Sequence, residues 1–140
     1  MFQRLRVPFF ALIFLFMLFP SFRADARMVS VGLSIGQSTL KISSASAMTV
    51  TDGAGKRHSI GGTAEFRAAG AGTVKAGNHS FRLPVTISGK APLSFNGRRY
   101  RGTFRIISSG SGITLVNVLD LEEYLRGVLK MEINPSWPME

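Results

Sequence analysis

One carboxylate near the C-terminal end of the sequence stands out as a group that could do chemistry. Glu132 has the apolar neighbours Met131 and Ile133, and Trp137 follows shortly after them. An apolar environment disfavours the charged form of a carboxylate and raises its pKa, so that it can act as a general acid. Acid-catalysed cleavage of a glycosidic bond needs such a group. From the local sequence alone, however, an ordinary exposed glutamate just beyond a helix is the commoner interpretation.

A cluster of arginines and aromatic residues around a predicted hairpin is a second candidate. Its members are Arg98, Arg99, Tyr100, Arg101, Phe104 and Arg105. The guanidinium groups could hold an anionic polymer while the aromatic rings offer stacking faces. Alternatively, the arginines form a solvated strand face that prevents aggregation at the hairpin edge. We take Arg98, Arg99, Tyr100, Arg101 and Trp137 as the candidate substrate-binding residues.

Metal and cofactor chemistry is not expected. The sequence has no cysteine, which excludes a thiol nucleophile, a cysteine-based metal site and disulfides. His58 and His79 are isolated in the sequence, and without metal-ligand spacing we interpret both as loop residues.

The N-terminal segment has the order of a secretory signal peptide. Arg4 and Arg6 precede an apolar run from Val7 to Phe19, and Ala24-Asp25-Ala26 is a small-x-small cleavage site. A membrane anchor is the alternative, but the run is shorter than the ~20 residues that a spanning helix needs. We therefore predict a signal peptide over residues 1–26, a mature domain over residues 27–140, and export to the periplasm or cell envelope.

The charge of the chain indicates which partners an exported domain would meet. The net charge is +9 over 140 residues. A basic protein outside the cytoplasm encounters wall polymers, peptidoglycan carboxylates and anionic lipid head groups. Nucleic acid is not an expected partner, and contact with the membrane is expected only through the signal segment.

Alternating apolar residues predict β-strands over most of the mature chain. Val29, Val31, Leu33 and Ile35 are expected to share one face of the first strand. Further strand patterns occur at Leu40 and Ile42, at Met48 and Val50 before the turn signal Asp52-Gly53, and at residues 63–67, 81–87, 104–107 and 113–118. Residues 70–77 are rich in small side chains and predict a loop. Pro84 indicates an edge position or a bend.

The clearest turn and the only clear helix lie close to the candidate residues. Asn96-Gly97 between strand-like runs is a strong hairpin signal. Asp120 is a good N-cap, and Glu123 would complete a capping box. The residues Leu121, Tyr124, Leu125 and Val128 form one helical apolar stripe. We therefore expect an α+β fold of mostly antiparallel strands and hairpins, with one C-terminal amphipathic helix at about residues 120–130 and the start of another at Pro138.

These same segments resemble a known family. Residues 116–128, Glu132 and the run from Ser136 to Glu140 are similar to the core of the stage II sporulation protein D family, which includes the LytB amidase enhancers. The run from Phe95 to Gly102 is similar to a hairpin of that family, and Val29 to Leu33 to its first strand. The resemblance is weak from about Ser43 to Gly89 and specific from Phe95 onward.

The resemblance implies a bacterial cell-wall role. Active members are lytic transglycosylases that cut peptidoglycan glycan strands stripped of their stem peptides, without a metal. Glu132 matches the position of the catalytic glutamate, which would first protonate the glycosidic oxygen and then act as a base while the 6-hydroxyl of the sugar closes a 1,6-anhydro ring. A non-catalytic module that binds peptidoglycan or stimulates a cell-wall amidase is the alternative.

Two departures from the family pattern bear on these expectations. Many members have Ser-Glu-Met-Pro around the glutamate, where this chain has Met131-Glu132-Ile133-Asn134. The family also continues beyond its Trp-Pro turn into an Ala-rich helix and a further section that completes the cleft. Because a preorganised pocket needs such support, we expect the 140-residue chain to represent the N-terminal part of the domain, incomplete at its C-terminus and inactive or incompletely folded by itself.

Overall fold

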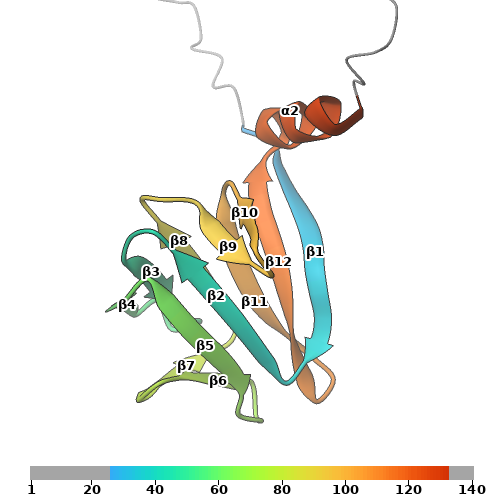
Figure 1. Ribbon diagram of the computed structural model, residues 1–140. Coiled ribbons are helices and arrows are strands. Elements are labelled where there is room, and N and C mark those ends of the chain that lie inside the picture. Colours follow the sequence, from blue (N-terminus) through green and yellow to red (C-terminus); the bar gives the residue numbers. More distant parts are fainter. Residues whose placement is uncertain (1–25, 133–140) are drawn as a thin grey trace, which may run out of the picture.

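The computed structural model describes residues 26–132, with side chains to Lys130. It contains twelve described strands and one described helix (Figure 1). The strands are β1 (Met28–Gln37), β2 (Thr39–Ser44), β3 (Met48–Thr51), β4 (Arg57–Ile60), β5 (Thr63–Ala68), β6 (Thr73–Ala76), β7 (His79–Arg82), β8 (Val85–Gly89), β9 (Leu93–Phe95), β10 (Arg98–Tyr100), β11 (Thr103–Ser109) and β12 (Gly112–Asp120), and the helix is α2 (Leu121–Glu132). The predicted signal peptide and the predicted second helix lie outside the described residues.

The strands form two antiparallel sheets of six strands each. The first sheet has the order β1-β12-β11-β8-β3-β4, and the second has the order β10-β9-β2-β5-β6-β7. Their inner faces supply one hydrophobic core. Its largest fully buried side chains are Phe66, Phe81, Phe104, Leu40, Ile42, Met48, Ile87, Leu93, Ile106, Ile113, Leu115 and Val50. The α+β prediction and the predicted excess of antiparallel strands are therefore confirmed for the described part of the chain.

Alternation places the predicted inner faces correctly in most strands. Leu40 and Ile42 of β2 are buried, and so are Met48 and Val50 of β3, while the residues between them are exposed. Successive side chains of a strand point to opposite faces, so this pattern can be read from the sequence.

The Asn96-Gly97 turn is also as predicted, because both residues have positive φ, 50° and 75°, as a two-residue hairpin requires.

The first strand departs from the predicted pattern at its end. Val29 and Val31 lie opposite Leu119 and Asn117 of β12. The pairing then shifts between Gly32 and Ser34 and again between Ser34 and Gln37. These irregularities change the face to which the later residues point, so that Ile35 is 73% exposed. The prediction that Ile35 shares one face with Val29, Val31 and Leu33 is therefore wrong, because those three side chains are half-buried.

Two other local predictions need correction. Residues 70–77 are not entirely loop, because residues 73–76 form β6, in which Val74 and Ala76 are buried. The residues from Phe81 to Ile87 do not form one strand: β7 belongs to the second sheet and β8 to the first. The chain changes sheet at the cis Leu83–Pro84 peptide, where a bend was predicted.

The helix α2 stands at one end of the molecule, next to the paired ends of β1 and β12 (Figure 1). Its predicted apolar stripe is only partly covered. Leu121 and Val128 are half-buried, whereas Tyr124 and Leu125 are exposed. Leu129, which is not part of the predicted stripe, is exposed as well. Within residues 26–132, no helix has the length and apolar character needed to cross a membrane.

Candidate functional site

The first turn of α2 is fixed to the sheet by main-chain and side-chain hydrogen bonds. Asp120 ends β12, and its Oδ1 accepts a hydrogen bond of 2.8 Å from the backbone N–H of Glu122. The backbone N–H of Leu121 donates to the carbonyl of Arg27, also at 2.8 Å. The prediction that Asp120 is the N-cap is thus confirmed. Satisfying these otherwise unpaired N–H groups defines where the helix begins.

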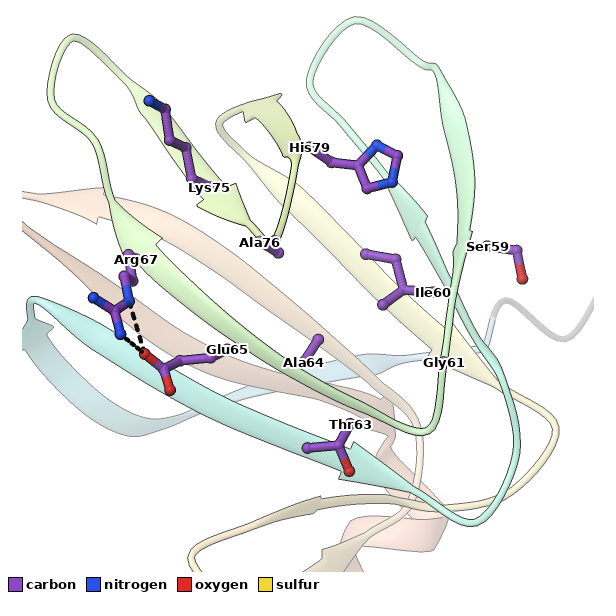
Figure 2. A pocket seen from close by; sticks show the side chains of 11 residues that line it. Ser59, Ile60, Gly61, Thr63, Ala64, Glu65, Arg67, Lys75, Ala76 and His79 are labelled. Atoms are coloured by element: carbon purple, nitrogen blue, oxygen red, sulfur yellow. Dashed lines mark hydrogen bonds and ion pairs between the residues drawn. The ribbon is translucent and has the colours of Figure 1, made fainter.

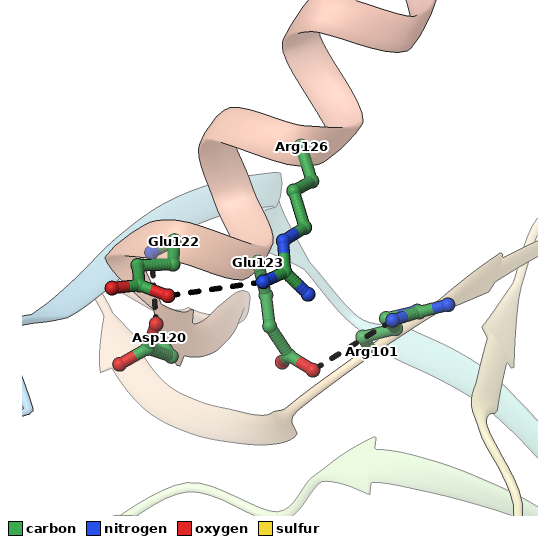
Figure 3. A network of polar contacts seen from close by, with 5 residues as sticks. All are labelled: Arg101, Asp120, Glu122, Glu123 and Arg126. Carbon is green, nitrogen blue, oxygen red and sulfur yellow. Dashed lines mark hydrogen bonds and ion pairs between the residues drawn. The ribbon is translucent and has the colours of Figure 1, made fainter.

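One ion pair links the first turn of α2 to the hairpin of β9 and β10, which carries Arg98, Arg99 and Arg101 (Figure 3). In this pair, Arg101 Nη1 lies 3.8 Å from Glu123 Oε1. A second pair lies within the helix, where Arg126 Nη2 is 3.9 Å from Glu122 Oε2. Glu123 was predicted to complete a capping box with Asp120. Its carboxylate lies instead against Arg101, because the hairpin that carries Arg101 comes close to the helix start.

Gly102 permits this close approach. Its φ is 83°, and a Cβ at this position would lie 2.7 Å from Leu119 Cβ and also contact the carbonyl oxygen of Val118. Only a residue without a side chain fits there without displacing the backbone of β12. The sequence Arg101-Gly102 therefore combines an ion pair to α2 with a close contact to the strand that leads into it.

The other candidate residues of the hairpin have different surroundings. Arg98 and Arg99 are exposed on β10, and neither forms an ion pair within the described part of the chain. Tyr100 is half-buried against the core, with its ring centroid 5.6 Å from that of Phe104 in an edge-on arrangement. Within residues 26–130, the hairpin thus offers two guanidinium groups without an ion pair, one paired guanidinium group and an aromatic ring that supports the core.

The structure places Glu132 at the end of α2, but its side chain is outside the description, as is all of Trp137. Glu132 is the last helical residue, nine positions after Glu123. At 1.5 Å per residue, the two positions are about 14 Å apart along the helix axis. Among the predicted arginines, Arg101 contacts α2, and it does so at the end of the helix opposite to Glu132.

Sequence reasoning missed two features of the described residues. His58 and His79 both lie in strands, not in loops, and their ring centroids are 5.5 Å apart beside Phe81. The two histidines are 21 positions apart along the chain, so that no local spacing pattern indicates their contact. Asn117 is 4% exposed in β12, and among the described residues its Oδ1 has no hydrogen-bond partner. No group of three or more potential metal-ligating side chains occurs within residues 26–132.

Comparison with known proteins finds similarity at this end of the chain. Residues 109–140 match the family model described as stage II sporulation protein. An uncharacterized protein of Brachyspira hyodysenteriae (strain ATCC 49526 / WA1) is 40% identical over 47 residues, which make up 34% of this chain and 13% of that protein. No solved structure matches the chain. The segment 109–140, which contains β12 and α2, is thus similar to the stage II sporulation protein family, and the resemblance predicted from the sequence is confirmed for this segment.

Proposed function

We propose that this protein is an exported bacterial cell-wall protein that acts as a peptidoglycan lytic transglycosylase on denuded glycan strands. The observation that carries the proposal is the family match over residues 109–140, because this segment includes the position of Glu132. The anchored start of α2 gives further support. Asp120 Oδ1 accepts a hydrogen bond from the N–H of Glu122, and the Arg27 carbonyl accepts one from the N–H of Leu121. These bonds fix the first turn of the helix to the sheet, and a catalytic group needs such a rigid support.

In the proposed reaction, Glu132 acts first as a general acid. Its carboxyl group gives a proton to the glycosidic oxygen, and the bond between that oxygen and the sugar C1 breaks. The resulting carboxylate then takes the proton of the 6-hydroxyl as the 6-oxygen bonds to C1 and closes the 1,6-anhydro ring. Glu132 is protonated again at the end, so that one residue serves both steps.

Glu132→Gln tests this assignment. Glutamine keeps the size of the side chain but removes its acid–base function. The assay uses the complete product of the gene, incubated with denuded glycan strands. We expect the unaltered protein to release anhydro-sugar products, which mass spectrometry detects. Release should fall by at least about a hundredfold in the variant, as is typical for removal of general acid–base catalysis.

Glu122→Gln is the matched control, because Glu122 is an exposed glutamate at the other end of the same helix. It should keep full product release. Equal release by the Glu132 and Glu122 variants would exclude Glu132 as the catalytic residue.

A non-catalytic module that binds peptidoglycan or stimulates a cell-wall amidase is the second candidate function. It is favoured by the free, exposed guanidinium groups of Arg98 and Arg99, which could bind wall carboxylates. Under this alternative, the unaltered protein and the Glu132→Gln variant would bind glycan strands equally and neither would release product.

A further inference from the structure

A cleft lies between β4, β5 and the β6–β7 hairpin (Figure 2). Figure 1 shows these strands at the end of the molecule away from α2. Its volume is about 730 Å³, within the range of ligand-binding clefts. It is lined by the end of β4, the first half of β5, and the β6–β7 hairpin. In Figure 2, Ile60 and Ala64 point into the space between β4 and β5.

The first half of β5 has an unpaired edge in this cleft. Thr63, Ala64 and Glu65 pair with β2 on one side. On the other side, β6 pairs only with Phe66, Arg67 and Ala68. Within the described residues, the backbone of the first three positions therefore has no partner strand on the cleft side. Free N–H and C=O groups along such an edge can accept an added strand.

Side chains from both faces of the sheet line the cleft, as expected at a strand edge. On the inner side, Ile60, Ala64 and Ala76 offer a small apolar surface. On the outer side lie the charged residues Glu65, Arg67 and Lys75. An extended chain laid along β5 would point successive side chains to these two sides in turn. Small apolar residues would suit the inner side.

The charges on the outer side favour an acidic occupant. Arg67 and Lys75 are directly opposite each other in the β5–β6 pairing, and like charges in that arrangement are unfavourable. Arg67 is compensated by Glu65, through a hydrogen bond of 2.7 Å from Nε to Oε1. Lys75 has no ion pair among the described residues. A carboxylate from a bound chain could therefore form an ion pair with the ammonium group of Lys75.

We propose that this cleft binds an extended segment of a partner polypeptide, in which acidic and small apolar residues alternate, as an additional strand on β5. This interaction is independent of the chemistry assigned to Glu132. The backbone of the segment pairs with Thr63–Glu65, one acidic side chain contacts Lys75, and the alternate side chains lie near Ala64 and Ala76.

Binding of a synthetic peptide of alternating glutamate and alanine tests the proposal. Two analogues accompany it: one with glutamine in place of glutamate, and one with N-methylated backbone amides, which cannot donate ladder hydrogen bonds. We expect the glutamate peptide to bind the full chain and to shift the amide NMR signals of Thr63, Ala64 and Glu65. Each analogue should bind at least about tenfold more weakly, the factor that corresponds to about 1.4 kcal/mol.

Gly61→Phe provides the variant that blocks the cleft. A Cβ at Gly61 meets no atom within 4 Å and the residue has no positive φ, so the side chain can be added without strain. Gly32→Phe is the matched control, since Gly32 has the same properties but lies on β1. We expect at least about tenfold weaker peptide binding for Gly61→Phe only, with unchanged thermal unfolding midpoints for both.

A second pair of variants tests the charge. Lys75→Gln should weaken binding of the glutamate peptide severalfold and leave binding of the glutamine analogue unchanged, whereas Lys56→Gln, in the β3–β4 turn, should change neither. Equal binding of all three peptides, undiminished binding by Gly61→Phe, or binding at the cleft of denuded glycan strands instead of the peptide would each overturn the proposal.

Discussion

Gly102 determines how closely the hairpin of Arg98, Arg99 and Arg101 approaches the start of α2. Because its φ is positive and its neighbours are backbone atoms and Leu119 Cβ, Gly102→Ala introduces both backbone strain and a clash. We expect a loss of about 2–4 kcal/mol in the free energy of unfolding, measured by urea denaturation.

Gly110→Ala is the control for this prediction. Gly110 has a φ of 58°, but a Cβ there meets no atom within 4 Å. The expected loss in the free energy of unfolding is therefore about 1–2 kcal/mol, which is the cost of placing an alanine at positive φ. If both substitutions destabilise the protein equally, the close contact with β12 contributes nothing.

At the residue scale, the sequence predicts roles that depend on neighbours in the chain, but not those that depend on neighbours in space. Asp120 was identified as a cap because the residues that it serves follow it directly. His58 and His79 were missed as neighbours because β4 and β7 belong to different sheets. Glu123 was assigned to the local capping box, whereas its nearest charged partner, Arg101, comes from the hairpin.

At the element scale, the stability of α2 depends on its first turn, because much of its apolar stripe is exposed. Asp120→Ala removes the acceptor for the N–H of Glu122. We expect a loss of about 1 kcal/mol in the free energy of unfolding and a lower helical signal in circular dichroism. Asp120→Asn should retain nearly full stability, since asparagine caps helices about equally well. Equal losses in the two variants would contradict the capping role.

Strands were predictable where large apolar residues alternate and were missed where they do not. β2 has Leu40 and Ile42 at alternate positions, and its inner face was predicted correctly. β6 contains only Val74 as a large apolar residue, next to glycine-rich turns, so its sequence resembles a loop. The apolar stripe of α2 correctly predicted a helix. The spacing of apolar residues shows which face of a helix is apolar, but it does not show which other element packs on that face. Exposure of Leu125 and Leu129 could be learned only from the structure.

At the scale of the whole molecule, the net charge of +9 would attract any anionic polymer. Binding of peptidoglycan therefore does not by itself show that the arginines of the hairpin are the binding site. We expect Arg98→Gln with Arg99→Gln to reduce sedimentation of the protein with purified peptidoglycan. Binding by the unaltered protein should weaken with salt, because the screening length falls from about 10 Å at 0.1 M to about 3 Å at 1 M.

Two substitutions at other exposed positions provide the control for this experiment. Arg57→Gln with Lys56→Gln removes the same charge from the β3–β4 hairpin, away from the start of α2. An equal reduction in both double variants would assign binding to the overall charge. Binding that does not respond to salt would argue against any role for the arginines.

The pairing of β1 with β12 also has a consequence for the order in which the chain folds. Met28 pairs with Asp120, more than ninety positions later, so the earliest strand of the described structure receives its partner last. Until β12 is in place, Val29 and Val31 lack their neighbours Leu119 and Asn117, and β1 has no partner strand. Contacts between such distant positions slow folding, and an unpaired apolar strand in an unfolded chain is prone to aggregate. The first sheet can therefore be completed only when nearly all of the described chain is available, whether the chain folds where it is made or after export.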